Sequence, residues 1–138
     1  MLSIGNSATS SRYLTIVPFL VHSSNANGSA HSRRLFRLDS GREPVREWLK
    51  NMRAEHRKTI GEDIKTLQIG WPVGMPLARK MDGDLWELRS SLTTGIARTF
   101  FTIYERNMVL LHGFLKKSQK TPPKELTIAK RRMNKLRS

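Results

Sequence analysis

The chain has 138 residues, a length typical of one domain with at most a short extension. It carries 25 Lys and Arg against 11 Asp and Glu, and the net charge of +14 indicates a nucleic acid, an anionic membrane or an acidic protein as partner. The lack of cysteine excludes disulfides, thiolate metal sites and cysteine nucleophiles. The four histidines lie without ligand spacing, and no run approaches the roughly 18 apolar residues of a membrane span. No metal, other cofactor or membrane partner is therefore expected.

The first 32 residues differ in composition from the rest. They are rich in Ser, Asn, Gly and Ala, hold Arg12 as their only Lys or Arg, and contain one apolar patch, Tyr13–Val21. Arg12 before that patch faintly imitates a secretory signal. A disordered extension, or translation from a start codon upstream of the true one, fits the composition better. We therefore divide the chain into an extension, residues 1–32, and a folded domain, residues 33–138.

The folded part is expected to begin with a strand and then a helix. Leu and Phe alternate with Arg over Arg33–Asp39, which predicts an edge strand. Ser40 and Glu43 have capping-box spacing, and Pro44 suits the first turn of a helix. Apolar residues at helical spacing then carry this helix to about Met52.

A second amphipathic helix follows, and the two together predict a helical hairpin. Ile60, Ile64 and Leu67 lie on one face of it, and Gly70 is placed to end it. The next six residues, Trp71–Pro76, contain two prolines and a glycine, which predicts a loop.

From Leu77 the apolar pattern changes to a period of two. Leu77–Met81 leads into Asp82-Gly83, a strong hairpin signal. Three strands are then expected, over Leu85–Ser91, Ile96–Tyr104 and Met108–Lys117. In the first of them Trp86 and Leu88 lie on one face, and Glu87 and Arg89 on the other. The apolar run of the last one predicts a central strand.

The chain ends with a basic helix. Thr121 is placed to cap it, with Pro122 or Pro123 at its first position, and a narrow apolar stripe runs to Leu136. The order strand, helix, helix, three strands, helix predicts an α+β domain with a small, largely antiparallel sheet. From Arg106 to Ser138 there are ten Lys or Arg and one acid, an excess that suits a polyphosphate because each neutralised phosphate releases counterions.

Two stretches carry a family resemblance, WELRSSLTTGIARTFFTIY (Trp86–Tyr104) and VLLHGFLKKSQKTPPKELTIAKRR (Val109–Arg132). They resemble the HigB-type branch of the RelE/ParE toxin superfamily, its phage-related relatives, over about Arg33 to Leu136. The resemblance implies a RelE-like sheet backed by the helical hairpin. It also implies a cytoplasmic toxin of a type II toxin–antitoxin pair, an endoribonuclease that cleaves mRNA on the ribosome and inhibits translation. Its partner is then a cognate antitoxin, a helix-turn-helix protein of HigA type.

RNA can be cut without a metal when its own 2′-hydroxyl attacks the adjacent phosphate. The protein must orient the backbone, assist removal of the 2′ proton, stabilise the charged phosphorane and help the 5′ oxygen to leave. Lys and Arg can supply the electrostatic part, and the fork of Arg binds two phosphate oxygens. DNA lacks the 2′-hydroxyl, so this mechanism selects RNA.

Four residues are the catalytic candidates: Arg98, Arg89, Lys116 and Lys117. Arg98 matches the active-site arginine that the family implies, although it could also be an edge-strand charge that discourages aggregation. Arg89 is as well explained by a salt bridge with Glu87. Alternation sends Lys116 and Lys117 to opposite faces, so only one can share the surface of Arg98, and Lys116 is favoured because it continues the face of His112 and Phe114.

Six further residues are RNA-binding candidates: Lys120, His112, Tyr104, Lys130, Arg131 and Arg132. His112 could act as an acid or base, but inside an apolar run a satisfied core histidine is the simpler interpretation. Tyr104 could stack on a base or lie buried near a turn. The run Lys130–Arg132 is either a solvated helix face or a contact for ribosomal RNA.

Two other functions remain open. A gyrase inhibitor of ParE type would use the same sheet to bind a protein, without catalysis. A basic nucleic-acid-binding module that has lost its activity is the other alternative, although 7% aromatic residues argue against a module that stacks single-stranded bases.

Overall fold

The computed structural model describes residues 15–16, 32–72, 77–116 and 120–138. The helices are α3 (Pro44–Lys50), α4 (Ala54–Gly70) and α5 (Pro123–Arg137). The strands are β2 (Thr15–Ile16), β3 (Ser32–Leu35), β4 (Ala78–Asp82), β5 (Leu85–Leu92), β6 (Gly95–Tyr104) and β7 (Asn107–Lys116). The predicted α+β class, the helical hairpin and the C-terminal helix are confirmed. The segment before the first hairpin turn is itself a strand, β4, so four strands follow the helices and not three.

These strands form one sheet in the order β2-β3-β7-β6-β5-β4. Every neighbouring pair is antiparallel except β3 and β7, which are parallel. The helical hairpin carries the chain from β3 to β4 at the opposite edge of the sheet. The prediction that β7 is central is confirmed. The prediction of β3 as an edge strand is wrong, because Thr15 and Ile16 pair with it on its other side. Ser32, the last residue of the predicted extension, begins β3, and apart from Thr15, Ile16 and Ser32 the extension lies outside the described residues.

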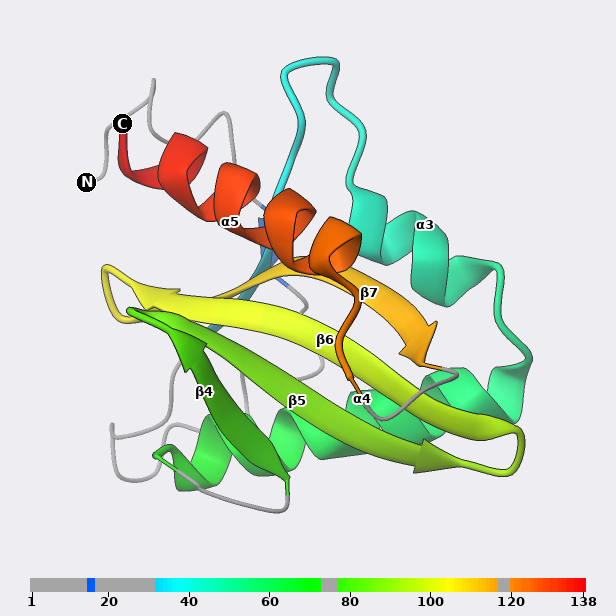
Figure 1. Ribbon diagram of the computed structural model, residues 1–138. Coiled ribbons are helices and arrows are strands. Elements are labelled where there is room, and N and C mark those ends of the chain that lie inside the picture. Colours follow the sequence, from blue (N-terminus) through cyan, green and yellow to red (C-terminus); the bar gives the residue numbers. More distant parts are fainter. Residues whose placement is uncertain (1–14, 17–31, 73–76, 117–119) are drawn as a thin grey trace.

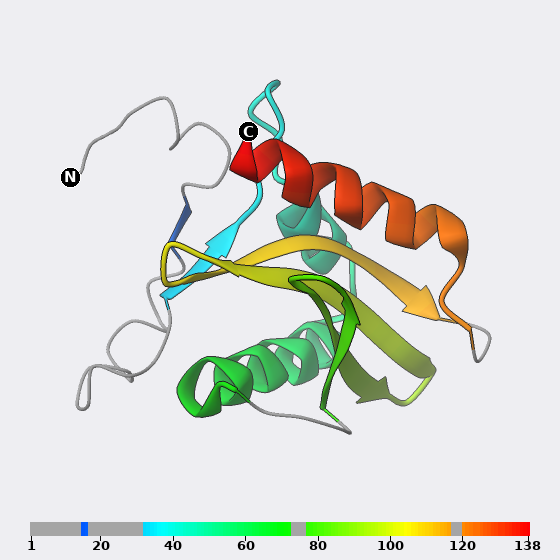
Figure 2. The ribbon, with the colours of Figure 1, turned by 60° about the vertical axis from the view of Figure 1, so that its left-hand side comes forward.

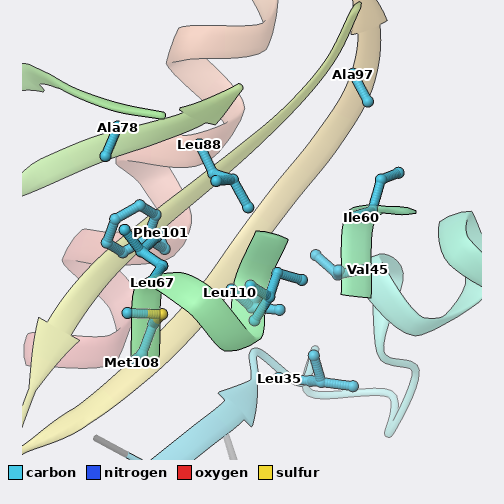
Figure 3. Close-up of a cluster of buried hydrophobic side chains, with 11 residues drawn as sticks. Leu35, Val45, Ile60, Leu67, Ala78, Leu88, Ala97, Phe101, Met108 and Leu110 are labelled. Carbon is cyan, nitrogen blue, oxygen red and sulfur yellow. The ribbon is translucent and has the colours of Figure 1, made fainter. Parts of the chain in front are cut away.

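Helices cover both faces of the sheet: Figures 1 and 2 show α4 on one side and α5 on the other. Helix α3 belongs to the α4 side, because Val45 packs in the same apolar cluster as Ile60 and Ile64. The hairpin side holds the larger apolar cluster (Figure 3), where helix α4 packs its buried stripe against the strands. Its fully buried members are Leu35, Val45, Ile60, Ile64, Leu67, Ala78, Leu88, Ala97, Phe101, Met108 and Leu110. Gly113 of β7 faces this side, where the Trp48 ring lies so close that a Cβ would overlap it.

A second cluster lies beneath α5. Its members come from the residue after β3, from β5, β6 and β7, and from the apolar stripe of the helix, and they are Phe36, Leu85, Phe100, Val109, Leu111, Phe114, Ala129, Met133 and Leu136. The predicted stripe of α5 is therefore confirmed. Because both faces are buried, a charged side chain on a central strand is removed from water and needs a charged or hydrogen-bonding partner.

Two irregularities in register set which side chains share a face. One lies between Lys80 and Asp82, so that Arg79 and not Lys80 stands opposite Glu87. The other lies in the β6–β7 pair, where Phe100 is opposite His112 but Phe101 is opposite Leu110. An extra residue of this kind is a β-bulge, and it changes the face of every side chain beyond it.

The predicted proline starts of both helices are confirmed, but neither predicted side-chain cap forms. The residue before a proline is held in extended conformation, so α3 begins at Pro44 with Glu43 as N-cap, and Ser40 lies outside the helix. In the same way α5 begins at Pro123 with Pro122 as its N-cap, without a side-chain cap from Thr121. The hydroxyl of Thr121 makes a different contact.

Candidate functional site

A buried carboxylate lies on the α5 side of the sheet, within hydrogen-bond distance of a residue two positions before α5. Glu87 of β5 is 0% exposed. Its Oε1 accepts a hydrogen bond from Arg98 Nη1 of β6 at 2.6 Å, and its Oε2 accepts one from Thr121 Oγ1 at 3.0 Å. Such pairing is what makes a buried charge tolerable, because an unpaired carboxylate would be strongly disfavoured away from water.

Lys116 is the last residue of β7 and lies on the same face. It is 7% exposed, and within the described residues its Nζ has no hydrogen-bond partner. Burial lowers the pKa of the Lys116 amine, and the neighbouring Arg98 lowers it further, while Glu87 opposes the change. Lys116 is thus a desolvated amine whose charge is only partly balanced.

Two more arginines stand closer to solvent. Arg79 of β4 places Nη2 3.7 Å from Glu87 Oε1, with 41% of its side chain exposed. Arg89 of β5 is half-buried and stands directly opposite Arg98 in the register. Burial lowers the pKa of Arg98, with Arg89 and Arg79 adding to the effect and Glu87 opposing it. We call this group, Arg79, Glu87, Arg89, Arg98 and Lys116, the Arg98 cluster.

The Arg98 cluster combines four cations with one carboxylate, an excess of charge that favours an anionic ligand. Its two arginines nearer solvent can meet a phosphate first, and their forked guanidinium groups suit its oxygens. Lys116, with its lowered pKa, can exchange a proton closer to neutral pH than an exposed lysine. Within the described parts of the chain no three His, Asp or Glu side chains converge as a metal site.

Residues 47–134 match the family model of phage-derived Gp49-like proteins (DUF891), a range that covers more than half of the chain. The chain belongs to the Gp49-like family. This family is toxin-like, of RelE/HigB type, so the predicted superfamily is confirmed at that level. No curated protein matches the sequence. The matched range includes all five residues of the Arg98 cluster.

Three of the four predicted catalytic residues of this Gp49-like chain come together in the Arg98 cluster: Arg98, Lys116 and Arg89. The idea of Arg98 as an edge-strand charge is wrong, because β6 lies inside the sheet and Arg98 is 3% exposed. Glu87 is an ion-pair partner as expected, but its partners are Arg98 and Arg79, and not Arg89. Lys117 lies outside the described residues.

His112 lies next to the cluster as a satisfied core histidine. Its ring lies roughly parallel to those of Phe100 and Phe114, which also stack on each other, and its Nε2 donates to Glu125 Oε1 at 2.6 Å. Arg132 Nη1 approaches Nδ1 at 3.4 Å, so a neutral ring protonated at Nε2 satisfies both contacts. Burial lowers the pKa of His112, with Arg132 adding to the effect and Glu125 opposing it. The simpler of its two interpretations is therefore supported.

Tyr104 is separated from the cluster. It ends β6 opposite Asn107, six residues along the strand from Arg98, which is about 20 Å at the usual rise per residue. It packs against the apolar cluster beneath α5, and burial raises its pKa. Tyr104 therefore cannot contact the phosphate that Arg98 would bind. Lys120 is exposed, just before α5.

The three cations predicted as one contact on α5 have three different environments. Lys130 Nζ pairs with Asp82 Oδ2 at 2.6 Å. Arg132 turns inward, and its Nη1 donates to the Leu111 carbonyl oxygen at 2.8 Å. Arg131 is exposed. Of these three, only Arg131 is exposed without an ion pair or hydrogen bond to another described residue.

Sequence reasoning missed two members of this site, Arg79 and Thr121. Arg79 precedes a predicted hairpin, but no local signal marks the bulge that sets Arg79 opposite Glu87. Thr121 precedes two prolines, a position that predicts a helix cap and not a site residue.

The three described helices are too short or too polar for a membrane span.

Proposed function

We propose that this Gp49-like protein is the toxin of a type II toxin–antitoxin pair, a metal-independent endoribonuclease that cleaves translated mRNA. The observation that carries the proposal is the Arg98 cluster, where four cations surround one carboxylate and the amine of Lys116 is buried. An enzyme that moves a phosphoryl group without a metal needs this type of positive, partly desolvated site.

The proposed step begins with attack of the 2′ oxygen of RNA on the adjacent phosphorus. The 2′ O–P bond forms, the P–O5′ bond breaks, and the products are a 2′,3′-cyclic phosphate and a 5′-hydroxyl. The neutral form of Lys116 accepts the 2′ proton, which its lowered pKa favours, and a protonated group or water supplies one to the leaving 5′ oxygen. Arg98, Arg79 and Arg89 stabilise the additional charge on the phosphorane.

The reaction is tested by inducing the protein in cells and mapping breaks in a translated message by primer extension. Discrete breaks within coding regions are expected, and purified protein should cut RNA in the presence of EDTA. We expect Arg98→Ala and Lys116→Ala each to lower the single-turnover rate by about 10²-fold or more, as for loss of one electrostatic donor. Lys58→Ala, which removes an exposed cation of α4, serves as the control at the wild-type rate.

Wild-type rates in folded Arg98→Ala and Lys116→Ala would remove the catalytic assignment. Intact mRNA together with gyrase-dependent DNA breaks would move the protein to the ParE-like inhibitors. Binding of RNA without either effect would leave a basic nucleic-acid-binding module.

The toxin-like family also suggests a cognate antitoxin. We infer that it is a small helix-turn-helix protein of HigA type encoded beside this chain, and that both act in the cytoplasm, where ribosomes carry mRNA. Co-expression with the neighbouring reading frame should restore growth and yield a complex that copurifies. A neighbouring frame that neither binds nor protects would contradict this pairing.

A further inference from the structure

One side chain connects the parts of the Arg98 cluster to each other. Glu87 lies on β5, accepts a hydrogen bond from Arg98 on β6 and lies near Arg79 on β4. It also accepts a hydrogen bond from the hydroxyl of Thr121, just before α5. Its two oxygens have different partners: Oε1 lies next to the two arginines, and Oε2 accepts the hydrogen bond of Thr121. At 0% exposure it cannot contact a substrate itself.

We infer that Glu87 is the positioning residue of this site: its carboxylate fixes Arg98 and ties the start of α5 to the sheet, so that Lys116 and the arginines present one surface to a phosphate. The inference rests on the proposed function for its catalytic consequence. Its structural part concerns the geometry and charge of the cluster alone.

The orientation of Arg98 depends on this contact. Its Nη1 donates to Glu87 at 2.6 Å, whereas its Nε has no hydrogen-bond partner within the described residues. A buried guanidinium with few acceptors is free to turn about its long side chain once its main acceptor is lost. Misplacement by about 1 Å can cost a reaction about 10²-fold in rate.

The contact with Thr121 extends this control to the connection between β7 and α5. Thr121 stands five residues after Lys116 and two before the first residue of α5. Its bond to Glu87 at 3.0 Å fixes the chain there against the middle of β5. The hydroxyl is neutral, so this tie affects geometry but not the charge of the cluster.

Glu87 also sets the charge balance at Lys116. The charged groups that face Lys116 are Arg98 on β6, Glu87 and Arg89 on β5, and Arg79 on β4. Glu87 is the only one of them that favours the protonated amine. Removing its charge should therefore lower the pKa of Lys116 further, and any limb of the pH–rate profile that Lys116 controls should move to lower pH.

The test uses the full chain with Glu87→Gln and Thr121→Val, and with Glu43→Gln as the matched control. Glu43 is a largely buried carboxylate that bonds to Arg46 at 2.7 Å, but it lies at the start of α3. Three quantities are measured on folded protein: the pKa of Lys116 by NMR of its labelled side chain, the affinity for a 2′-O-methyl RNA that cannot be cut, and the single-turnover cleavage rate against pH.

For Glu87→Gln we expect a lower Lys116 pKa, a profile moved to lower pH, and a cleavage rate reduced by about tenfold or more. Affinity for the uncut RNA should stay equal or become tighter, because a negative charge beside the phosphate is lost. Thr121→Val should lower the rate without moving the pKa, and it keeps the test open if Glu87→Gln fails to fold. Glu43→Gln should change none of the three quantities.

An unchanged Lys116 pKa in folded Glu87→Gln would overturn the inference, and so would a cleavage rate equal to that of the Glu43→Gln control. A wild-type chain that cuts no RNA would overturn the proposed function instead. The pKa of Lys116 would then still decide whether Glu87 sets the charge of the cluster.

Discussion

The polar side chains on the α5 face of the sheet are of two kinds, those with hydrogen-bond partners and those without a partner among the described residues. Both ring nitrogens of His112 have hydrogen-bond partners. The amine of Lys116 is buried, and within the described residues it has no hydrogen-bond partner. A buried ion pair such as Glu87 and Arg98 contributes little net stability, because its attraction barely offsets the loss of hydration. Placing more cations around it lowers stability further, and that arrangement is better explained by ligand binding than by folding.

The lowered pKa of His112 predicts how the free energy of unfolding depends on pH. Its folded pKa lies below the value near 6.5 of an unfolded chain, so between these two values the unfolded state binds more protons. The free energy of unfolding should therefore fall as pH decreases through about 6.5, and the loss should level off below the folded pKa. Urea unfolding at several pH values checks this, with His112→Gln losing this part of the slope. An unchanged slope in the variant would contradict the assignment.

At the scale of elements, strand β7 contacts helices on both of its faces, and Gly113 determines how closely α3 approaches it. Gly113 admits the ring of Trp48 from α3 on one face, while the neighbouring His112 and Phe114 pack beneath α5 on the other. The bulge beside Leu111 leaves its carbonyl to accept the hydrogen bond of Arg132. Thus one strand fixes both helical layers, and its end delivers Lys116 to the site.

We expect Gly113→Ala to destabilise the protein by about 1–3 kcal/mol, because the added Cβ would overlap the Trp48 ring and force it to move. Urea unfolding measures the change. Gly61→Ala is the matched control, since a Cβ there meets nothing within 4 Å, and in a helix it should stabilise by about 0.5–1 kcal/mol. In the double variant Trp48→Leu should recover part of the loss, and strict additivity would count against the overlap.

Across the whole molecule, the net charge of +14 does not form one continuous basic surface, because many cations are paired with acidic side chains. Part of the basic charge of α5 is used in contacts with the body: Lys130 with Asp82, Lys135 with Asp39 and Arg137 with Asp84. Such exposed pairs contribute little stability, and each neutralises a cation that the sequence alone would assign to RNA.

Arg131 and Arg132 should therefore differ when each is replaced by Ala. Arg131→Ala should weaken RNA binding and reduce the slope of log affinity against log salt by about 1, with unchanged unfolding. Arg132→Ala should instead lower the free energy of unfolding by about 1–3 kcal/mol, because the Leu111 carbonyl loses its partner. Salt-dependent binding and urea unfolding of both variants check this. If the two variants changed RNA binding and unfolding to the same extent, the different roles of Arg131 and Arg132 would be contradicted.

The sequence by itself determined the elements and much of the site. Alternation and helical spacing depend only on neighbours along the chain, so they predict the hairpin of helices, the central β7 and the shared face of Arg98 and Lys116. The resemblance carried by the quoted motifs also predicted a RelE/HigB-type toxin, and the Gp49-like family is of that type.

Only the tertiary structure decided which charges meet. The bulge before Asp82 brings Arg79 and not Lys80 opposite Glu87, and a one-residue shift of this kind reverses faces without any strong local signal. Likewise, the proline before Pro123 leaves Thr121 outside α5, where its hydroxyl can reach Glu87 across 34 positions of sequence. Such contacts depend on register and on distant strands, because burial selects a partner by position in space and not by position along the chain.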